Sequence, residues 1–157
     1  MDPSTSDVVV GRESPLQDEV VRMVAALDAY CSALYPKESN HFVPVEALAT
    51  PDVHFFVARQ DGHAVGCGAI RLDGRGHAEV KRMWVTPEAR GLGVGVRILE
   101  TLEAAARAQG LTSLRLETGI HQPEALGLYR RAGFLDRDPF PPYRPDPLSV
   151  FMEKTLL

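Results

Sequence analysis

The stretch VTPEARGLGVG, residues Val85–Gly95, decides the fold because an extended run ends in it and a long helical pattern begins. Its glycines leave no side chains where backbone N–H groups would approach an anion. The first turn of a helix adds about half a positive charge, and Arg90 adds a full one. The stretch therefore predicts a pyrophosphate-binding turn, with a glycine-rich turn before a surface helix as the plainer alternative.

Three phosphate-binding patterns compete for this turn. The dinucleotide fingerprint G-x-G-x-x-G fails because Val96 stands where its third glycine would be. A Walker A loop fails because its Gly-Lys-Ser/Thr is absent. The coenzyme A pattern Arg-x-x-Gly-x-Gly fits Arg90–Gly95. The turn is thus typical of a coenzyme A site.

Around the turn, hydrophobic periodicity predicts alternating strands and helices. Asp61-Gly62 between two β-rich runs is typical of a tight hairpin. The expected strands are residues 8–10, 53–59, 64–72, 78–86, 111–118, 134–136 and 149–155. The expected helices begin at a Ser14–Gln17 capping box and end at Pro36, span 44–49 and 91–109, and run from Pro123 to Gly133. This order predicts a single α/β domain over residues 1–157, an α+β arrangement on a mixed sheet.

Composition narrows the function classes. The chain has 157 residues, 45% hydrophobic and 24% charged, which is typical of one globular domain. Its net charge of −4 weighs against nucleic acid and anionic membranes as partners. Between Lys81 and Arg97, however, four cations face one acid, a local balance of 4 − 1 = +3, which suits a single pyrophosphate.

Targeting and metal signals are weak. The longest apolar run, Met23–Leu27, is far shorter than the roughly 20 residues of a membrane span, and the N-terminus does not read as a secretory signal. Cys31 and Cys67 are expected to be reduced thiols, and the histidines form no metal-binding motif. We expect a cytoplasmic protein without a metal.

Two motifs together resemble the GNAT acetyltransferase superfamily. One is the strand end Met83-Trp84-Val85-Thr86-Pro87 before the glycine turn. The other is the later run QPEALGLYRRAGF, Gln122–Phe134, which is similar to the family's N-x-x-A-x-x-L-Y-x-x-x-G-F with Gln122 in place of the usual Asn. The resemblance implies an acyl-CoA N-acyltransferase fold, a mostly antiparallel central sheet with helices on both faces, and acetyl-CoA as cosubstrate.

The resemblance also implies how acetyl-CoA would be held. A splayed neighbouring strand would leave the backbone of Met83, Trp84 and Val85 unpaired, to bind the pantetheine arm and, through the Val85 N–H, polarise the thioester carbonyl. The pyrophosphate would lie on the turn, and Gln122 would replace the usual polar contact of Asn. The turn residues expected to bind it are Arg90, Gly91, Leu92, Gly93, Val94 and Gly95.

Two side chains are the main catalytic candidates. Tyr129 is expected to be the general acid for the leaving thiolate, with a structural core tyrosine as the alternative. Glu79 is expected to be the base, because period two places residues 79, 81, 83 and 85 on one face; the alternative is an ion pair with Lys81 or Arg82. Glu117 and His121 are weaker candidates. Trp84 is expected on the opposite face, in the core, and Cys67 is expected to be packed there as well.

The acceptor site is expected between residues 35–42 and 139–147. Ser39, Asn40, His41 and Tyr143 are the candidate lining residues. The leading function is direct transfer of acetyl from acetyl-CoA to a primary amine of a small molecule or amino acid, in a ternary complex. The alternatives are a protein N-terminal or lysine acetyltransferase, and a CoA-binding sensor without turnover. The resemblance also implies a homodimer, which is common among members of the family.

Overall fold

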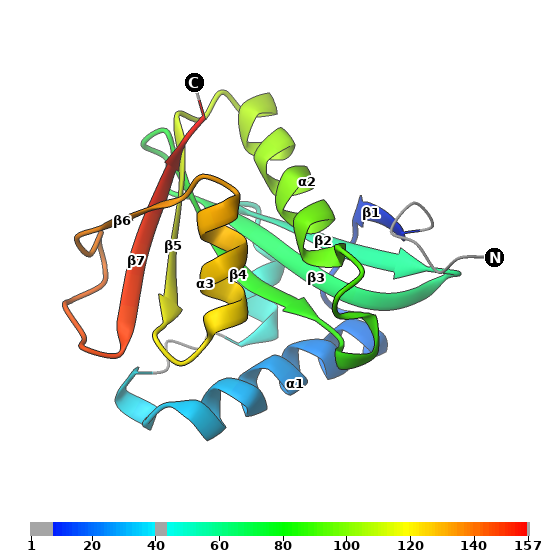
Figure 1. Cartoon of the computed structure of the whole chain (residues 1–157). Coiled ribbons are helices and arrows are strands. Elements are labelled where there is room, and N and C mark those ends of the chain that lie inside the picture. The colour runs from blue at the N-terminus through cyan, green and yellow to red at the C-terminus, as the bar shows by residue number, and fades with distance from the viewer. Residues whose placement is uncertain (1–7, 40–43, 157) are drawn as a thin grey trace.

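The computed structural model describes residues 8–39 and 44–156, and its strands form one seven-stranded sheet (Figure 1). The spatial order is β1-β2-β3-β4-β5-β7-β6. The strands are β1 (Val8–Arg12), β2 (Val53–Gln60), β3 (His63–Leu72), β4 (His77–Val85), β5 (Ser113–Gly119), β6 (Leu135–Arg137) and β7 (Ser149–Thr155). Only β4 and β5 pair in parallel. The predicted mixed, mostly antiparallel sheet is confirmed.

Helices cover both faces of the sheet, as predicted (Figure 1). They are α1 (Asp18–Leu34), α2 (Val94–Ala108) and α3 (Pro123–Arg131), with short 3-10 turns η2 (Lys37–Ser39), η3 (Val45–Ala49) and η4 (Pro87–Ala89). On one face α1 packs Val20 and Met23 into a cluster that contains Val57. On the other, α2 packs Ile98 and Leu102 into the larger cluster. Burial of each such side chain contributes about 1.5–3 kcal/mol.

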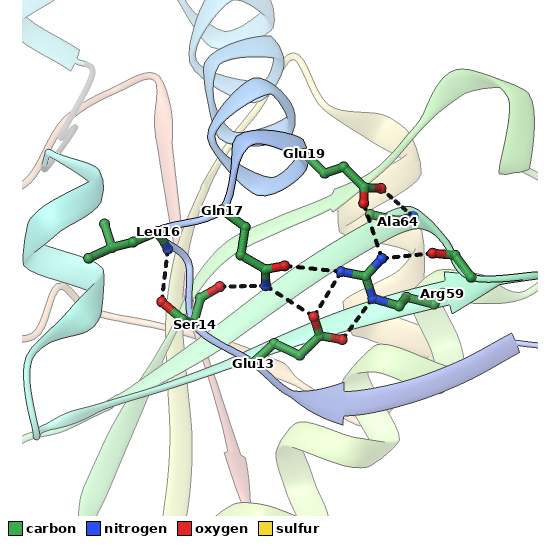
Figure 2. A network of polar contacts seen from close by, with 8 residues as sticks. Glu13, Ser14, Leu16, Gln17, Glu19, Arg59 and Ala64 are labelled. Atoms are coloured by element: carbon green, nitrogen blue, oxygen red, sulfur yellow. Dashed lines mark hydrogen bonds and ion pairs between the residues drawn. The ribbon is translucent and has the colours of Figure 1, made fainter.

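The predicted capping box at the start of α1 is wrong. The helix begins at Asp18, and Gln17 precedes it in an extended conformation. Figure 2 shows why: Gln17 Nε2 donates to Glu13 Oε1 at 3.0 Å, and Arg59 Nη2 donates to Gln17 Oε1 at 3.2 Å. Arg59 also pairs with Glu13 at 2.8 Å and with Glu19 at 3.3 Å. A tertiary ion-pair network therefore takes the side chain that the local pattern assigned to a cap.

The conformation of two turns depends on glycines with positive φ. Asp61 and Gly62 both adopt positive φ, 51° and 81°, as the mirror-image hairpin turn requires, so the predicted hairpin between β2 and β3 is confirmed. Helix α2 begins at Val94 rather than at Gly91, because Gly91 and Gly93 hold left-handed φ values of 81° and 78° that no helix continues through. The glycine turn is longer, and the helix shorter, than predicted.

Strands β4 and β5 pair only from His77–Glu79 to Ser113–Arg115, although β4 continues to Val85 and β5 to Gly119. Beyond these pairs the two parallel strands diverge. Arg82 has a φ of 54°, and the register between β3 and β4 shifts beside it, which marks a β-bulge. The candidate site lies beside this bulge, where β4 and β5 diverge.

Candidate active site

A pocket of about 550 Å³ lies at the end of β4, between the glycine turn and α3. It includes all the predicted cofactor residues except Leu92, which packs against the core instead. The first turn of α2 forms part of the pocket wall. Because Gly95 has no side chain, space remains between it and Leu128, whose nearest atom lies 3.2 Å from where a Cβ of residue 95 would be. The pocket thus combines backbone amides, a helix N-terminus and open space, which fits a pyrophosphate and its attached arm.

Arg90 and Trp84 form one side of this pocket. The Arg90 guanidinium carbon lies 4.7 Å from the centre of the Trp84 ring, and Arg90 Nε donates to the Val85 carbonyl at 3.1 Å. The arginine is exposed, so its positive charge lies at the opening of the pocket, held there by a cation–π contact with the indole. Trp84 packs against the core cluster on the α1 side, as predicted, but it is only half-buried and also lines the pocket.

A second pocket of about 120 Å³ opens where β4 and β5 diverge. Its walls come from α1, β4, β5, α3 and the start of β7. The polar and reactive side chains in it are Cys31, Tyr35, Ser39, Arg82, Glu117, Thr118, Gln122, Tyr129 and Ser149. Ser149 Oγ donates to Glu117 Oε2 at 2.7 Å, and this bond orients the carboxylate.

Tyr129 lies at the junction of the two pockets. Leu27, Met83, Gln122 and Tyr129 line both of them. Tyr129 is 6% exposed and packs edge-on against Phe134 at 5.7 Å. Burial raises the pKa of its phenol, so the hydroxyl keeps its proton at neutral pH. A buried, protonated donor at the meeting point of two cavities suits an acid for group transfer.

Glu79 does not share a face with Met83 and Val85, contrary to the sequence prediction. Partners across a sheet share a face, and β3 residues Arg71, Ala69 and Cys67 lie opposite Glu79, Lys81 and Trp84 respectively. The bulge at Arg82 inserts one residue and reverses the alternation after it. Glu79 therefore lies on the same side as Trp84, while Met83 and Val85 pack on the α2 side.

The carboxylate of Glu79 is engaged in a hydrogen bond and in ion pairs with neighbouring side chains. It accepts a hydrogen bond from the Tyr143 hydroxyl and pairs with Lys81 Nζ at 3.0 Å and Arg71 Nη2 at 3.4 Å. Lys81 also donates to Tyr143 at 2.9 Å. Neither Glu79 nor Tyr143 is among the residues that line the two pockets. This network fastens the proline-rich segment 139–147 to the sheet.

Tyr35, at the end of α1, binds the short connection between β5 and α3. Its hydroxyl accepts from the His121 N–H at 3.1 Å and donates to Gln122 Oε1 at 3.1 Å. Its ring stacks on His121 at 5.5 Å. Gly119 makes room for it, because a Cβ there would lie 1.8 Å from the Tyr35 oxygen. Gln122, one methylene longer than the expected Asn, is thereby held at the pocket junction.

The predicted acceptor residues have different outcomes. Ser39 lines the smaller pocket and donates to Asp146 Oδ2 at 2.8 Å, whereas Tyr143 serves the Glu79 network. Asn40 and His41 lie outside the described residues. His121 is exposed and stacked on Tyr35. Cys67 is fully buried, as predicted, and burial raises the pKa of its thiol to about 12.

Sequence reasoning missed Arg82 and Cys31 as pocket residues, included Tyr35 only as the first residue of the expected acceptor segment 35–42, and ranked Glu117 low. Cys31 was visible only as part of the apolar stripe of α1. Arg82 was visible only as a charge beside Glu79. The ordinary period of two placed it away from the cleft, and no local pattern announces a bulge.

Within residues 8–39 and 44–156, no helix has the length and apolarity to cross a membrane. The same part of the chain holds no cluster of three or more His, Cys, Asp or Glu residues that could bind a metal.

The fold and the paired pockets define an acyl-CoA-dependent acyltransferase. Residues 21–134 match the family model described as the acetyltransferase (GNAT) family, and the chain belongs to that family. It is 56% identical to the IAA acetyltransferase of Azospirillum brasilense over 151 residues, covering 96% of this chain and 99% of that protein.

Solved structures share the fold. A protein from Klebsiella pneumoniae assigned as an acyl-CoA N-acyltransferase is similar with a TM-score of 0.82 and 42% identity, over 96% of this chain and 98% of that one. The PaiA N-acetyltransferase of Thermoplasma acidophilum, solved with coenzyme A, has a TM-score of 0.71 at 18% identity, over 94% of this chain and 98% of that one.

Proposed function

We propose that the protein transfers an acetyl group from acetyl-CoA to a primary amine of a small molecule or amino acid, by direct attack in a ternary complex. The observation that supports this most is the junction at Tyr129, where a pocket of about 550 Å³ meets one of about 120 Å³. The larger pocket fits the cosubstrate, and the smaller one fits an acceptor of a few heavy atoms better than a folded polypeptide.

Acetyl-CoA, when bound, supplies the acetyl thioester. The turn at Gly91–Gly95 and Arg90 would hold the pyrophosphate, and the diverging end of β4 at Met83–Val85 would offer backbone groups to the pantetheine arm. A Val85 N–H aimed at the thioester carbonyl would stabilise developing negative charge there. Tyr129 would hold a proton at Oη for the departing sulfur, which is worth about 10²–10⁴-fold in rate.

A base must take the proton of the acceptor ammonium, because only the neutral amine attacks. Glu117 is the carboxylate in the acceptor pocket, oriented by Ser149, and we assign it this role. The predicted role of Glu79 stays a prediction, but its argument from a shared face fails, because Met83 and Val85 lie on the opposite face of β4 after the bulge and Tyr143 engages Glu79. A matched pair of variants separates the two carboxylates.

The test is a thiol-release assay with acetyl-CoA and a panel of amines, amino acids and an N-terminal peptide, with IAA added because a 56% identical relative is named for it. We expect release of CoA with at least one small amine. Saturable binding of acetyl-CoA without release for any acceptor would instead support a CoA-binding sensor, and turnover of the peptide alone would support a protein acetyltransferase.

With the best amine, Glu117→Gln and Glu79→Gln are compared over pH 6 to 10. We expect Glu117→Gln to lower kcat most at neutral pH and to recover at high pH, where the amine is already neutral. Glu79→Gln should keep the wild-type pH profile. The opposite pattern would support Glu79, rather than Glu117, as the base.

The homodimer implied by the family resemblance stays a prediction, and sedimentation of the purified chain tests it.

A further inference from the structure

Arg131 lies in the last turn of α3 and lines the larger pocket. The neighbouring Arg130 pairs with Asp136 at 3.2 Å and is not part of that pocket's wall. Among the residues that the structure describes, no carboxylate forms an ion pair with Arg131. Two adjacent arginines of one helix therefore have different surroundings, and only Arg131 lies at the larger pocket.

Gly127, one turn earlier in α3, leaves the space that the Arg131 guanidinium occupies. A Cβ at residue 127 would lie 2.9 Å from Arg131 Nη1, 3.6 Å from Cζ and 3.8 Å from Nη2. The terminal nitrogens of Arg131 therefore lie back across the helix, over the glycine. Glycine in the interior of a helix is destabilising relative to alanine, so room for this side chain comes at a cost in helix stability.

The glycine turn forms another wall of the same pocket. Leu128 of α3 lies 3.2 Å from where a Cβ of Gly95 would be, so α3 packs against the start of α2 at this level. Arg90 comes from the turn and Arg131 from α3, and Glu124 is the one acid among the described residues that line this pocket. The larger pocket therefore has a cation on each of two walls.

Acetyl-CoA carries phosphate at two separate places, as the pyrophosphate and as a monoester on the 3′ carbon of the ribose. The backbone amides of the glycine turn and Arg90 are the proposed partners of the pyrophosphate, whereas the monoester needs a cation of its own. A phosphate monoester carries about −1.5 to −2 charge at pH 7 and has three acceptor oxygens. A guanidinium matches it in shape as well as in charge, because it donates two parallel hydrogen bonds.

We propose that Arg131 binds the 3′-phosphate of the cosubstrate, and that Gly127 is the residue that lets the guanidinium take this position. This inference rests on the proposed function, which has CoA in the larger pocket. With Arg90 on one wall and Arg131 on another, the two arginines bind separate phosphates of one ligand. The pocket then distinguishes CoA from thioesters and nucleotides that lack a 3′-phosphate.

The first test is calorimetry of the wild-type protein with CoA and with dephospho-CoA, which keeps the pyrophosphate and lacks only the 3′-phosphate. We expect CoA to bind at least about threefold more tightly, the effect of a well-aligned charge pair at an exposed site, and this preference to decrease as salt is raised. Equal affinities would overturn the inference and still support the proposed function. Binding of neither ligand would overturn both.

The second test compares Arg131→Gln with Arg130→Gln, a control that removes the adjacent charge from the same end of α3. We expect Arg131→Gln to bind CoA and dephospho-CoA about equally, and Arg130→Gln to keep the wild-type preference. Affinity for both ligands that falls by the same factor in Arg131→Gln would leave the preference intact and overturn the assignment, since it would indicate a contact with the pyrophosphate or a structural role. Melting curves establish that each variant folds.

A third variant, Gly127→Ala, leaves both arginines in place and moves only the guanidinium of Arg131, because the new Cβ would meet its Nη1. We expect the preference for CoA to fall toward that of Arg131→Gln, although alanine favours the helix and the melting temperature should not fall. Adding Gly127→Ala to Arg131→Gln should leave both affinities unchanged. An unchanged preference in Gly127→Ala, or a further loss of CoA affinity in the double variant, would overturn the role of Gly127 in placing Arg131.

Discussion

The two pockets that meet at Tyr129 are assembled in different ways. The larger takes most of its wall from one continuous stretch, residues 83–96, and from α3. The smaller takes single side chains from α1, β4, β5, α3 and β7. The first depends on backbone amides and on glycine φ values, which are local properties of the chain. The second depends on which side chains converge where β4 and β5 part, and the bulge at Arg82 changes which side chains of β4 are among them.

The two pockets therefore also differ in how they recognise a ligand: the larger through backbone groups and the smaller through side chains. A backbone cradle accepts a pyrophosphate whatever the neighbouring side chains are, so family members can share it. An acceptor pocket built from side chains changes with each substitution. Variants that affect one pocket and spare the other measure how independent the two are.

The largest expected effect is at the junction. Tyr129→Phe should lower kcat by about 10²–10⁴-fold, because it removes the proton donor and leaves the ring in place. Burial raises the pKa of this phenol, so wild-type kcat should not fall through Tyr129 ionisation below about pH 10. Steady-state kinetics checks both. An unchanged kcat with a normal melting curve would return Tyr129 to a purely structural role.

The next effect falls mainly on the smaller pocket, which Tyr35 and Gly119 line. Gly119→Ala places a Cβ 1.8 Å from the Tyr35 hydroxyl oxygen, so the Tyr35–Gln122 bond must break, at about 1–3 kcal/mol of unfolding free energy. The KM for the amine should rise more than that for acetyl-CoA. Gly11→Ala is the control, since nothing lies within 4 Å of a Cβ there. Equal behaviour of both variants in urea melts would contradict the clamp.

A third pair addresses the cofactor pocket. Gly91 and Gly110 both have left-handed φ, 81° and 72°, and open space around a Cβ. Gly91→Ala and Gly110→Ala should each cost about 1–2 kcal/mol of stability from backbone strain. Only Gly91→Ala should raise the KM for acetyl-CoA. A matching rise in Gly110→Ala would mean that the turn contributes through general stability rather than through binding.

The smallest effect concerns the strand β7 beside the acceptor pocket. Burial opposes ionisation of Glu153, but hydrogen bonds from Ser113, Arg115 and Arg137 lower its pKa to about 2. Its stabilising contribution is full above the unfolded pKa near 4.3 and is lost as pH falls toward 2. Thermal melts of Glu153→Gln should therefore lose less stability than wild type between pH 5 and 2.5. Parallel losses would show that Glu153 is not coupled to folding.

Sequence patterns predicted every strand of the sheet and the three main helices. They failed at places where a distant side chain competes with a local preference. Gln17 joins Arg59 instead of capping α1. Trp84 lies on the same face as Glu79 rather than the opposite one, where it packs against the core cluster and also contacts Arg90 at a pocket. In each case the partner is far away in sequence or was hidden by the regular alternation that the prediction assumed.

The sequence by itself determined the family, the sheet and the glycine turn that we propose binds phosphate, because these depend on contiguous residues: periodic apolar positions, a hairpin Asp-Gly and glycines in a strand-to-helix turn. Tertiary structure alone decided which carboxylate lines the smaller pocket. An extra residue at Arg82 reverses the alternation of β4 after it, so that Met83 and Val85 lie on the face opposite Glu79. Tyr143 engages Glu79, while Glu117 and Arg82 line the pocket. A one-residue bulge leaves no local signature, yet it exchanges the two faces of a strand.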